Sequence, residues 1–401
     1  MERNTSPQIS ETTFRILVAL SAAHCMNDAL QSVISAAYPI LKDDLSLSFG
    51  QIGLITLVYQ SAASVFQPLT GLYFDRRPSP WSLPAGMVFT LVGLLSLAFA
   101  TTLPWVLASV LTVGIGSSTF HPEASRLTSL ASGGKRGLAQ SLFQVGGNIG
   151  GSLGPLLVAL WIAPYGRQHI ADFALLAGIA IGVMLPVSRW YKKRLILLRQ
   201  TGNPGAHNRI SPPLPLRQTI LSILILLFLI FSKYIYMASL SSFYTFYLIE
   251  KFGVTVQYSQ LLLFVFAVST AIGTLIGGPV GDRIGRKYVI WASILGAAPF
   301  ALLMPHAGLF WTVILSFCVG LIIASAFPAI LVYAQELLPY KLGLVSGLFF
   351  GFAFGVAGIA SAVLGKMADL YGIEAIYNVC AYMPLLGLIT WFLPDLKKAS
   401  R

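Results

Sequence analysis

The chain has 401 residues, of which 56% are hydrophobic and only 10% are charged, and its mean hydropathy is +0.77. This composition excludes a soluble globular protein and is typical of a protein that crosses a membrane many times. The formal net charge of +12 gives no support to nucleic-acid binding, because most Lys and Arg residues fall on one side of the predicted membrane topology.

Apolar runs long enough to cross a bilayer predict twelve membrane-spanning helices. Six precede a polar stretch at residues 191–217 and six follow it. We therefore expect an all-α integral membrane fold with an N-terminal six-helix bundle (1–190), a cytoplasmic linker (191–217) and a C-terminal six-helix bundle (218–401). The bias of Lys and Arg places both termini in the cytoplasm. The approximate spans are 16–40, 51–74, 82–101, 104–125, 138–163, 171–190, 219–248, 257–281, 288–305, 308–335, 342–365 and 374–394.

The first span carries four polar residues on one helical face. His24, Asn27, Asp28 and Gln31 follow the spacing i, i+3, i+4 and i+7. One interpretation is a hydrogen-bonded cluster between helices, and the other is a substrate or proton site. An ionisable residue inside a membrane favours the second interpretation. Because His24 lies one turn from Asp28, we expect the two side chains to be able to share a proton near neutral pH.

The fourth span places His121, Pro122 and Glu123 next to one another. On a regular helix His121 and Glu123 point in nearly opposite directions, so they share a cavity only if Pro122 distorts the helix. Arg126 lies one turn beyond Glu123 and offers its carboxylate a salt bridge. We therefore predict that His121 faces the transport pathway. Two roles stay open for Glu123, namely a salt bridge at a gate and a proton carrier.

The fifth span carries two stripes of residues. Gln140, Gln144 and Asn148 are spaced by four and form a polar face, which we assign to the substrate and proton pathway. Glycines spaced by four, between residues 146 and 154, form a second face. Small residues at this spacing let helices approach closely and slide.

The seventh span contains Lys233, deep within an apolar run. A buried ammonium group is costly unless a group of opposite charge meets it. Lys233 can snorkel, pair with an acid such as Asp28, or bind an anionic substrate. Tyr236 and Tyr244 lie on the same helical face. This aromatic face favours a binding cavity, in which we expect both tyrosine hydroxyls to help hold an anion.

A cationic turn with a single acid occurs in equivalent positions of the two halves, which indicates an internal duplication. We expect Asp75 to bind the N-terminal end of the eleventh span and Asp282 to bind that of the fifth, so that both hold the cytoplasmic side closed. The residues assigned to the gating turns are Asp75, Arg76, Arg126, Arg136, Gly278, Asp282, Arg283, Gly285, Arg286 and Glu336.

No stretch of the sequence has the spacing of a catalytic site, such as a nucleophile elbow, a phosphate-binding loop or a metal-ligand cluster. The three cysteines, Cys25, Cys318 and Cys380, fall within predicted spans and are interpreted as small core residues. We therefore expect a protein that is not an enzyme and that holds neither a metal nor a cofactor.

Across its whole length the chain resembles the fosmidomycin resistance protein family of the major facilitator superfamily. The matching segments are Phe120-His121-Pro122-Glu123, residues 137–148, Phe231-Ser232-Lys233-Tyr234 and the turn at residues 278–287. The resemblance implies export of fosmidomycin, an anionic phosphonate, driven by a proton gradient through alternating access between the two bundles. It also implies that spans one, four, seven and ten line the cavity, that span two packs on span eleven and that span five packs on span eight.

We accordingly expect a multi-pass protein of the plasma membrane, the inner membrane in bacteria, that acts on a small molecule as a monomer. Asp28 is the first choice for the proton carrier, with Glu123 and His121 as alternatives. Two other classes stay open. One is an uptake symporter for a sugar or an organic acid, which the same fold accommodates. The other is a non-transporting membrane sensor or enzyme, against which the missing catalytic spacing argues.

Overall fold

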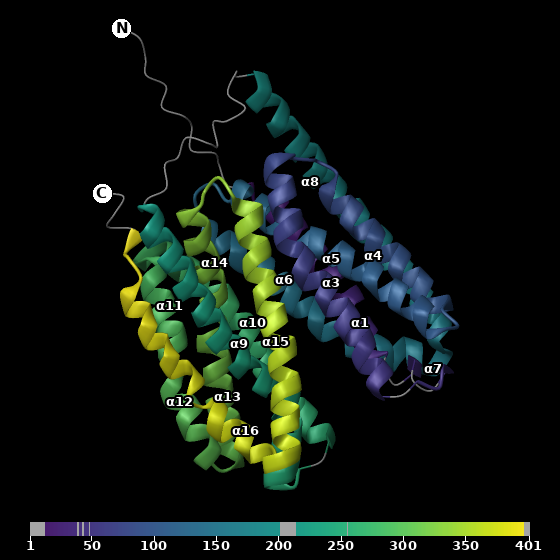
Figure 1. Ribbon diagram of the computed structural model, residues 1–401, viewed down its shortest axis with the longest axis vertical. Helices are drawn as coiled ribbons and strands as arrows, with labels where there is room; N and C mark the ends of the chain where they lie inside the picture. The colour runs from purple at the N-terminus through teal and green to yellow at the C-terminus, as the bar shows by residue number, and fades with distance from the viewer. Residues whose placement is uncertain are drawn as a thin grey trace.

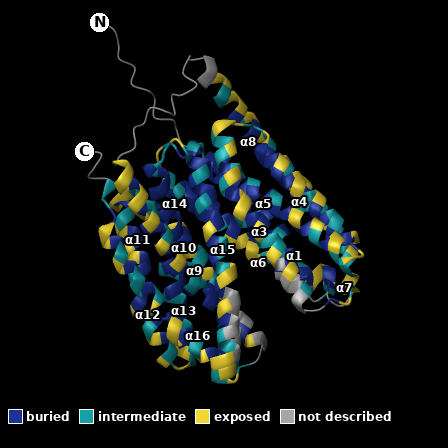
Figure 2. Cartoon of the chain, viewed as in Figure 1, coloured by how far each residue is buried: buried dark blue, intermediate teal, exposed yellow. Residues whose placement is uncertain are grey.

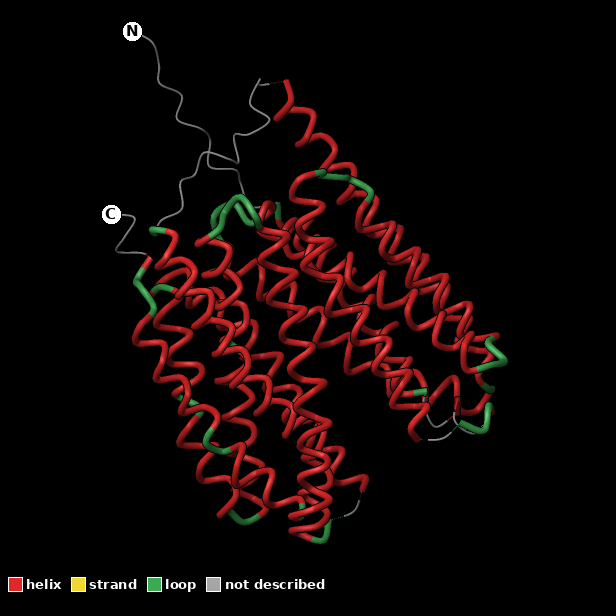
Figure 3. Tube along the Cα trace, in the orientation of Figure 1, coloured by secondary structure: helices red, strands yellow, loops and turns green. Residues whose placement is uncertain are grey.

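The protein, described here by a computed structural model, is almost entirely helical. Within the described residues every regular element is a helix, and most of the loops join the helices at their ends (Figure 3). Long apolar segments adopt helices because a helix satisfies its own backbone hydrogen bonds where a bilayer offers no water. The predicted all-α fold is confirmed. The described residues are 13–37, 40–41, 44–47, 49–200, 214–254 and 256–396.

Within the described residues, the N-terminal bundle contains six long helices. Between the last two of them the chain passes through a π-helical turn η1 (Val158–Ile162), the single turn α7 (Ala163–Tyr165) and a 3-10 turn η2 (Arg167–Phe173). The long helices are α1 (Phe14–Ala36), α3 (Phe49–Arg76), α4 (Ser82–Phe99), α5 (Leu103–Ala131), α6 (Arg136–Leu157) and α8 (Ala174–Gln200).

In the described part of the C-terminal bundle, three helices are continuous and three are broken near a proline. The continuous ones are α9 (Leu216–Phe252), α10 (Val256–Ile284) and α15 (Leu342–Tyr371). Proline removes a backbone donor and disturbs the preceding turn, and Pro299, Pro328 and Pro384 each lie just after a break. The broken helices are α11 (Arg286–Leu295) with α12 (Ala298–Leu303) and η3 (Met304–His306), α13 (Leu309–Ala324) with α14 (Ala326–Leu337), and α16 (Ile373–Cys380) with η4 (Met383–Phe392).

Each of the twelve predicted spans coincides with one of these helices or with consecutive helical pieces. The end of the sixth span is the main difference, because α8 continues to Gln200 instead of ending near residue 190. Arg194 anchors this basic extension: its Nη1 donates to the carbonyl of Leu130 (3.1 Å) and its guanidinium lies over the ring of Trp190. The first part of the predicted linker is therefore helix, and residues 201–213 lie outside the described residues.

The two bundles lean together at one end and diverge toward the other (Figure 1). They meet at the end where α8 finishes and α9 begins, which we call the linker end. Helix α3 packs on α15, and α6 packs on α10. This pairing confirms the expected contacts of span two with span eleven and of span five with span eight.

Two pairs of glycines allow close contacts between the bundles. A Cβ atom added to Gly278 on α10 would overlap the carbonyl oxygen of Gly137 on α6, and one added to Gly71 on α3 would overlap that of Gly343 on α15. The two contacts are equivalent under the internal duplication. Small residues therefore allow the backbones at the linker end to touch.

Many residues on the outward sides of both bundles are exposed (Figure 2), and many of these are large and apolar. Leu160, Leu175, Phe310 and Ile359 are among the most exposed of them. Such a surface suits contact with lipid tails rather than with water. Most of the polar residues predicted to form the site are buried, for example His24, Asn27, His121 and Lys233.

Candidate substrate and proton site

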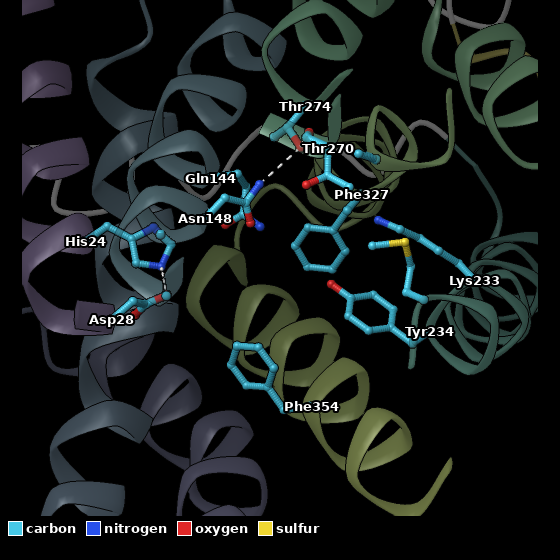
Figure 4. Close-up of a pocket in the computed structure, with 14 residues that line it drawn as sticks. His24, Asp28, Gln144, Asn148, Lys233, Tyr234, Thr270, Thr274, Phe327 and Phe354 are labelled. Atoms are coloured by element: carbon cyan, nitrogen blue, oxygen red, sulfur yellow. Dashed lines mark hydrogen bonds and ion pairs between the residues drawn. The ribbon is translucent and has the colours of Figure 1, made fainter. Parts of the chain in front are cut away.

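A cavity of about 340 Å³ lies between the two bundles, and both contribute side chains to it (Figure 4). Its volume is near the lower end of the range for ligand pockets, so it suits a small molecule. Helices α1, α6, α9, α13 and α14 line it, as do α10 and α15. Helix α5 contributes no lining residue among those described, so the expected lining by span four and the predicted position of His121 at the pathway are wrong for this conformation. The lining residues are His24, Asp28, Gln144, Gly147, Asn148, Gly151, Lys233, Tyr234, Met237, Thr270, Thr274, Ala324, Phe327 and Phe354.

The carboxylate of Asp28 lies between two histidines. His24 Nε2 is 3.2 Å from Asp28 Oδ2, and His121 Nε2 is 3.2 Å from Asp28 Oδ1. Both imidazoles are buried, whereas 21% of the Asp28 side chain is exposed. Since Asp28 lines the cavity, its exposed part faces the space where a substrate would lie. The structure therefore brings together three of the residues that the sequence analysis selected.

Packing and backbone contacts fix the orientation of both imidazoles. His24 Nδ1 donates to the carbonyl of Phe143 (2.7 Å), and its ring stacks on that of Phe143. His121 Nδ1 donates to the carbonyl of Ser117 (3.0 Å). One ring nitrogen of His24, one of His121 and one carboxylate oxygen of Asp28 lie within 4.8 Å of one another. These atoms are close enough to share protons or to enclose a metal ion.

The other two polar residues of the first span support this cluster from the side. Asn27 Nδ2 donates to Asp28 Oδ1 (3.0 Å). Gln31 Oε1 accepts hydrogen bonds from the hydroxyls of Tyr59 (2.8 Å) and Ser117 (3.1 Å). Neither residue lines the cavity. The prediction that Asn27 and Gln31 line the pathway is therefore wrong for this conformation. They lie behind Asp28 and support it.

Lys233 lies across the cavity from His24 and Asp28 (Figure 4). Only 4% of the residue is exposed, and its Nζ lies 5.1 Å from the ring centroid of Tyr234 and 5.3 Å from that of Phe327. These are cation–π distances. Lys233 makes no ion pair with a described residue, so the considered pairing with Asp28 is absent from this conformation.

Tyr236 and Tyr244 do not line the cavity, which corrects their predicted place beside the substrate. Both are fully buried in the core of the C-terminal bundle, where the hydroxyl of Tyr244 bonds to Ser316 Oγ (2.9 Å). The spacing predicts that Lys233 shares its face with Tyr236 and Tyr244, whereas α9 is rotated so that these two tyrosines point into the bundle core. The residues that accompany it at the cavity are Tyr234 and Met237.

The polar face of the fifth span divides between the cavity and the linker end. Gln144 and Asn148 line the cavity, as predicted, and Asn148 Nδ2 donates to Thr274 Oγ1 of the other bundle (3.3 Å). Gln140 lies elsewhere: its Nε2 donates to the carbonyl of Ser125 (2.8 Å). Its predicted place in the pathway is therefore wrong for this conformation.

A hydrogen-bonded network that includes Ser125 closes the space between the bundles on the linker side of the cavity. Ser129 Oγ donates to Gln335 Oε1 (2.5 Å), and Gln335 Nε2 donates to Ser346 Oγ (2.9 Å). Ser125 and Ser346 share a further bond of 3.0 Å. All four side chains are buried. The sequence analysis did not select them, because isolated Ser and Gln residues carry no distinctive pattern.

Glu123 is held in a salt bridge within the N-terminal bundle. It is fully buried and accepts hydrogen bonds from Arg126 Nε (2.8 Å), Arg126 Nη2 (2.5 Å) and Ser82 Oγ (3.0 Å). Arg126 also donates to the hydroxyl of Tyr191 (2.8 Å). All four residues belong to the N-terminal bundle. Glu123 and Arg126 therefore join α4, α5 and α8, away from the cavity.

The acids of the two cationic turns bind the backbone of the opposite bundle, as predicted. Asp75 accepts hydrogen bonds from the amides of Gly343 (2.9 Å) and Leu344 (2.8 Å), at the start of α15. Asp282 accepts them from the amides of Gly137 (3.0 Å) and Leu138 (3.1 Å), at the start of α6. A carboxylate at a helix N-terminus satisfies free amide groups and meets the positive end of the helix dipole.

The remaining residues of the gating turns differ in their contacts. Arg286 pairs with Asp282 (2.6 Å) and with Glu336 (3.2 Å). Gly285 has φ +107°, a conformation that favours glycine, at the junction of α10 and α11. Arg76 and Arg283 are exposed, and Arg136 is partly buried near Glu336.

Replacing Asp75 or Asp282 with Asn should open the linker end. An Asn side chain has one acceptor oxygen and no charge, so it loses one amide hydrogen bond and the attraction of the helix terminus. A hydrogen bond to a charged group contributes roughly 1.5–3 kcal/mol, which corresponds to a shift of about tenfold or more in the conformational equilibrium. Cysteine labelling of cavity positions from the linker side should rise accordingly.

The matched control for this experiment is Asp44→Asn, which removes a surface ion pair with Arg167. It should leave the labelling rate unchanged, because exposed ion pairs contribute little. Equal labelling in Asp75→Asn, Asp282→Asn and the parent protein would show that the two acids do not hold the linker end closed.

Residues 20–247 and 224–401 each match the family model of the Major Facilitator Superfamily. The chain is 57% identical to the fosmidomycin resistance protein of Escherichia coli (strain K12), over 96% of this chain and 94% of that protein. It is 38% identical to an uncharacterized MFS-type transporter of Bacillus subtilis (strain 168), YfnC, over 99% and 97% of the two chains. Its fold is similar to that of FucP, a transporter solved in an outward conformation, with a TM-score of 0.73 at 15% identity and coverage of 94% of this chain and 98% of that one.

Proposed function

Because the chain belongs to the major facilitator superfamily of membrane transporters, we propose that it exports a small anionic drug, a phosphonate of the fosmidomycin class, in exchange for protons. The protein is a transporter rather than an enzyme, and transporters of this family typically need no cofactor. The drug class is suggested by the relative in Escherichia coli, whose name records resistance to fosmidomycin. The proton gradient is the proposed energy source.

The unpaired ammonium of Lys233 is the observation that carries this proposal. It is a buried cation at a cavity between the two bundles, and it lies over the rings of Tyr234 and Phe327 without an ion pair to any described residue. Burial of a charge without a counter-ion is costly, so an anion that enters the cavity gains a strong partner. The amides and hydroxyls of Gln144, Asn148 and Thr270 offer hydrogen bonds to the rest of a small polar molecule.

We also propose that the linker end faces the cytoplasm and that both termini lie on that side of a bacterial inner membrane. Support comes from the positive-inside rule, since Arg76, Arg77, Lys135, Arg136 and Lys287 lie at this end. With the linker end closed by Asp75 and Asp282, the structure then corresponds to an outward-facing state. The cavity lies within one chain, which is consistent with a functional monomer.

Asp28 is the proposed proton carrier, as the carboxylate that lines the cavity. It belongs to the N-terminal bundle, whereas Lys233 belongs to the C-terminal bundle, so alternating access changes the distance between them. Exchange of drug and protons requires that the binding of one disfavours the other. In the proposed cycle, the inward-facing state brings Asp28 toward Lys233 when no drug is bound, and the drug competes for the same ammonium.

Uptake of an organic anion together with protons is the second candidate function. One observation favours it: in this conformation Asp28 contacts two histidines and Lys233 contacts none of the three. A proton on the cluster and an anion on Lys233 can then be bound at the same time, which is the requirement for symport.

Transport by inverted membrane vesicles separates the two functions. Inverted vesicles expose the cytoplasmic face, so an exporter should accumulate radiolabelled fosmidomycin when respiration acidifies the interior, and a protonophore should abolish the accumulation. Cells that express the chain should also tolerate more fosmidomycin than cells without it. Fosmidomycin loss from preloaded energised vesicles would instead establish symport, and no fosmidomycin flux in either direction would overturn the drug assignment.

A further inference from the structure

We propose that His24, Asp28 and His121 form one site for two protons, so that both histidines carry coupling protons together with the carboxylate. This inference rests on the proposed proton coupling and adds the number of protons and the groups that hold them. It is carried by the positions of the four imidazole nitrogens, two of which contact backbone carbonyls while the other two face one carboxylate.

The backbone contacts determine which nitrogen of each ring carries a hydrogen when the ring is neutral. A carbonyl oxygen can only accept a hydrogen bond, so the Nδ1 of His24, 2.7 Å from the oxygen of Phe143, must donate. The same holds for the Nδ1 of His121, 3.0 Å from the oxygen of Ser117. In a neutral ring the second nitrogen then has a lone pair and no hydrogen. Both Nε2 atoms are therefore proton acceptors in their neutral form.

Both Nε2 atoms lie close to a group that is already negative. Each Nε2 lies 3.2 Å from a different oxygen of Asp28. Without added protons the cluster has a net charge of −1 and two repulsive contacts between electron pairs. One proton satisfies only one of the contacts. Two protons give each contact a positive hydrogen and leave the cluster with a net charge of +1, so two protons are needed to satisfy the geometry.

Among the described residues, few other ionisable groups face the cluster. Cys25 lies on the same helix, α1, and interacts electrostatically with Asp28. Lys233 on α9 lies across the cavity. The side chains that α15 places against His121 are the rings of Phe350 and Phe354, while Glu123 on α5 is bound to Arg126. The protons of the cluster are thus shared mainly among its own three members.

The positions of the three groups also suggest a route for the protons. Asp28 is the member with appreciable exposure to the cavity, whereas His24 and His121 are buried behind it. A proton that reaches the carboxylate from the cavity can pass to either Nε2 over a single contact. Asp28 therefore acts as the entry point, and the histidines act as the sites that retain the protons.

The number of protons per drug molecule tests this assignment. Purified protein in liposomes is given opposing gradients of fosmidomycin and of pH, and the pH gradient at which net drug flux vanishes gives the stoichiometry independently of rate. The parent protein should balance with two protons per fosmidomycin. His24→Gln and His121→Gln should each balance with one proton per fosmidomycin, because Gln keeps a polar amide but does not take up a proton in the pH range of the experiment.

His169→Gln is the matched control, because His169 also contacts an aspartate, Asp172, but is exposed and outside the cavity. It should keep the parent stoichiometry. Drug flux coupled to one proton in the parent protein, or to the parent number of protons in both His24→Gln and His121→Gln, would overturn the two-proton site while leaving drug transport intact. If a Gln variant fails to insert, His24→Asn and His121→Asn, which place an amide near Nδ1, provide the same comparison.

Discussion

Replacing Asp28 with Asn should abolish proton-driven fosmidomycin transport, reducing accumulation in energised vesicles to the level of vesicles without the protein. The carboxylate is the cavity-facing member of the cluster, so its loss removes both the negative charge that attracts protons and the path to the histidines. The substitution is nearly isosteric, and the new amide can donate to the free lone pair of His24 or His121. The fold should therefore survive while coupling is lost.

A measurement of drug affinity distinguishes a loss of proton coupling in Asp28→Asn from a general loss of the folded protein. Because Lys233 is untouched, purified Asp28→Asn protein should bind fosmidomycin within about tenfold of the parent affinity, a difference of about 1.4 kcal/mol. Asp172→Asn is the matched control, since it also removes an aspartate that contacts a histidine, but on the surface. Full proton exchange with the drug in Asp28→Asn protein would transfer the carrier role to His24 and His121 alone.

The sequence predicts well both the fold and the site residues on the first span, because both depend on local patterns. Long apolar runs define helices in any membrane protein, and the spacing of His24 and Asp28 places them on one face whatever packs against it. The positions of Asp75 and Asp282 could be predicted for the same reason: a lone acid in a cationic turn needs a partner, and the duplication supplies two such turns. The end of α8 was missed because basic residues continue the helix beyond the membrane.

The cavity residues of the C-terminal bundle could not be predicted from spacing alone. Lys233 sits at the edge of its helical face, so its aromatic neighbours depend on how α9 is rotated within the bundle. The duplication contains a signal for one of them: the offset that superposes Pro122 on Pro328 also superposes His121 on Phe327. The same offset places Tyr234 at the position of Asp28. Equivalent positions thus hold the proton cluster in one half and the aromatic surroundings of Lys233 in the other.

Replacing Lys233 with Gln should remove most of the affinity for anionic drugs, by about ten- to a hundredfold, while neutral compounds of similar size bind as before. Hydrogen bonds to a charged group contribute roughly 1.5–3 kcal/mol, and in this conformation no carboxylate of a described residue competes with the drug for this ammonium. Glutamine keeps length and polarity but has no charge. Calorimetric titration with fosmidomycin at two salt concentrations measures the effect.

Lys251→Gln is the matched control on the same helix. Lys251 also lies over two aromatic rings, those of Tyr247 and Phe252, and its Nζ donates to the hydroxyl of Tyr247, but it is outside the cavity. It should leave fosmidomycin affinity unchanged. A purely structural role for Lys233 predicts the opposite pattern, because removing an unpaired buried charge relieves a desolvation cost and should raise the thermal midpoint without changing affinity. A stably inserted Lys233→Gln protein that binds fosmidomycin as tightly as the parent would therefore exclude Lys233 as the anion site.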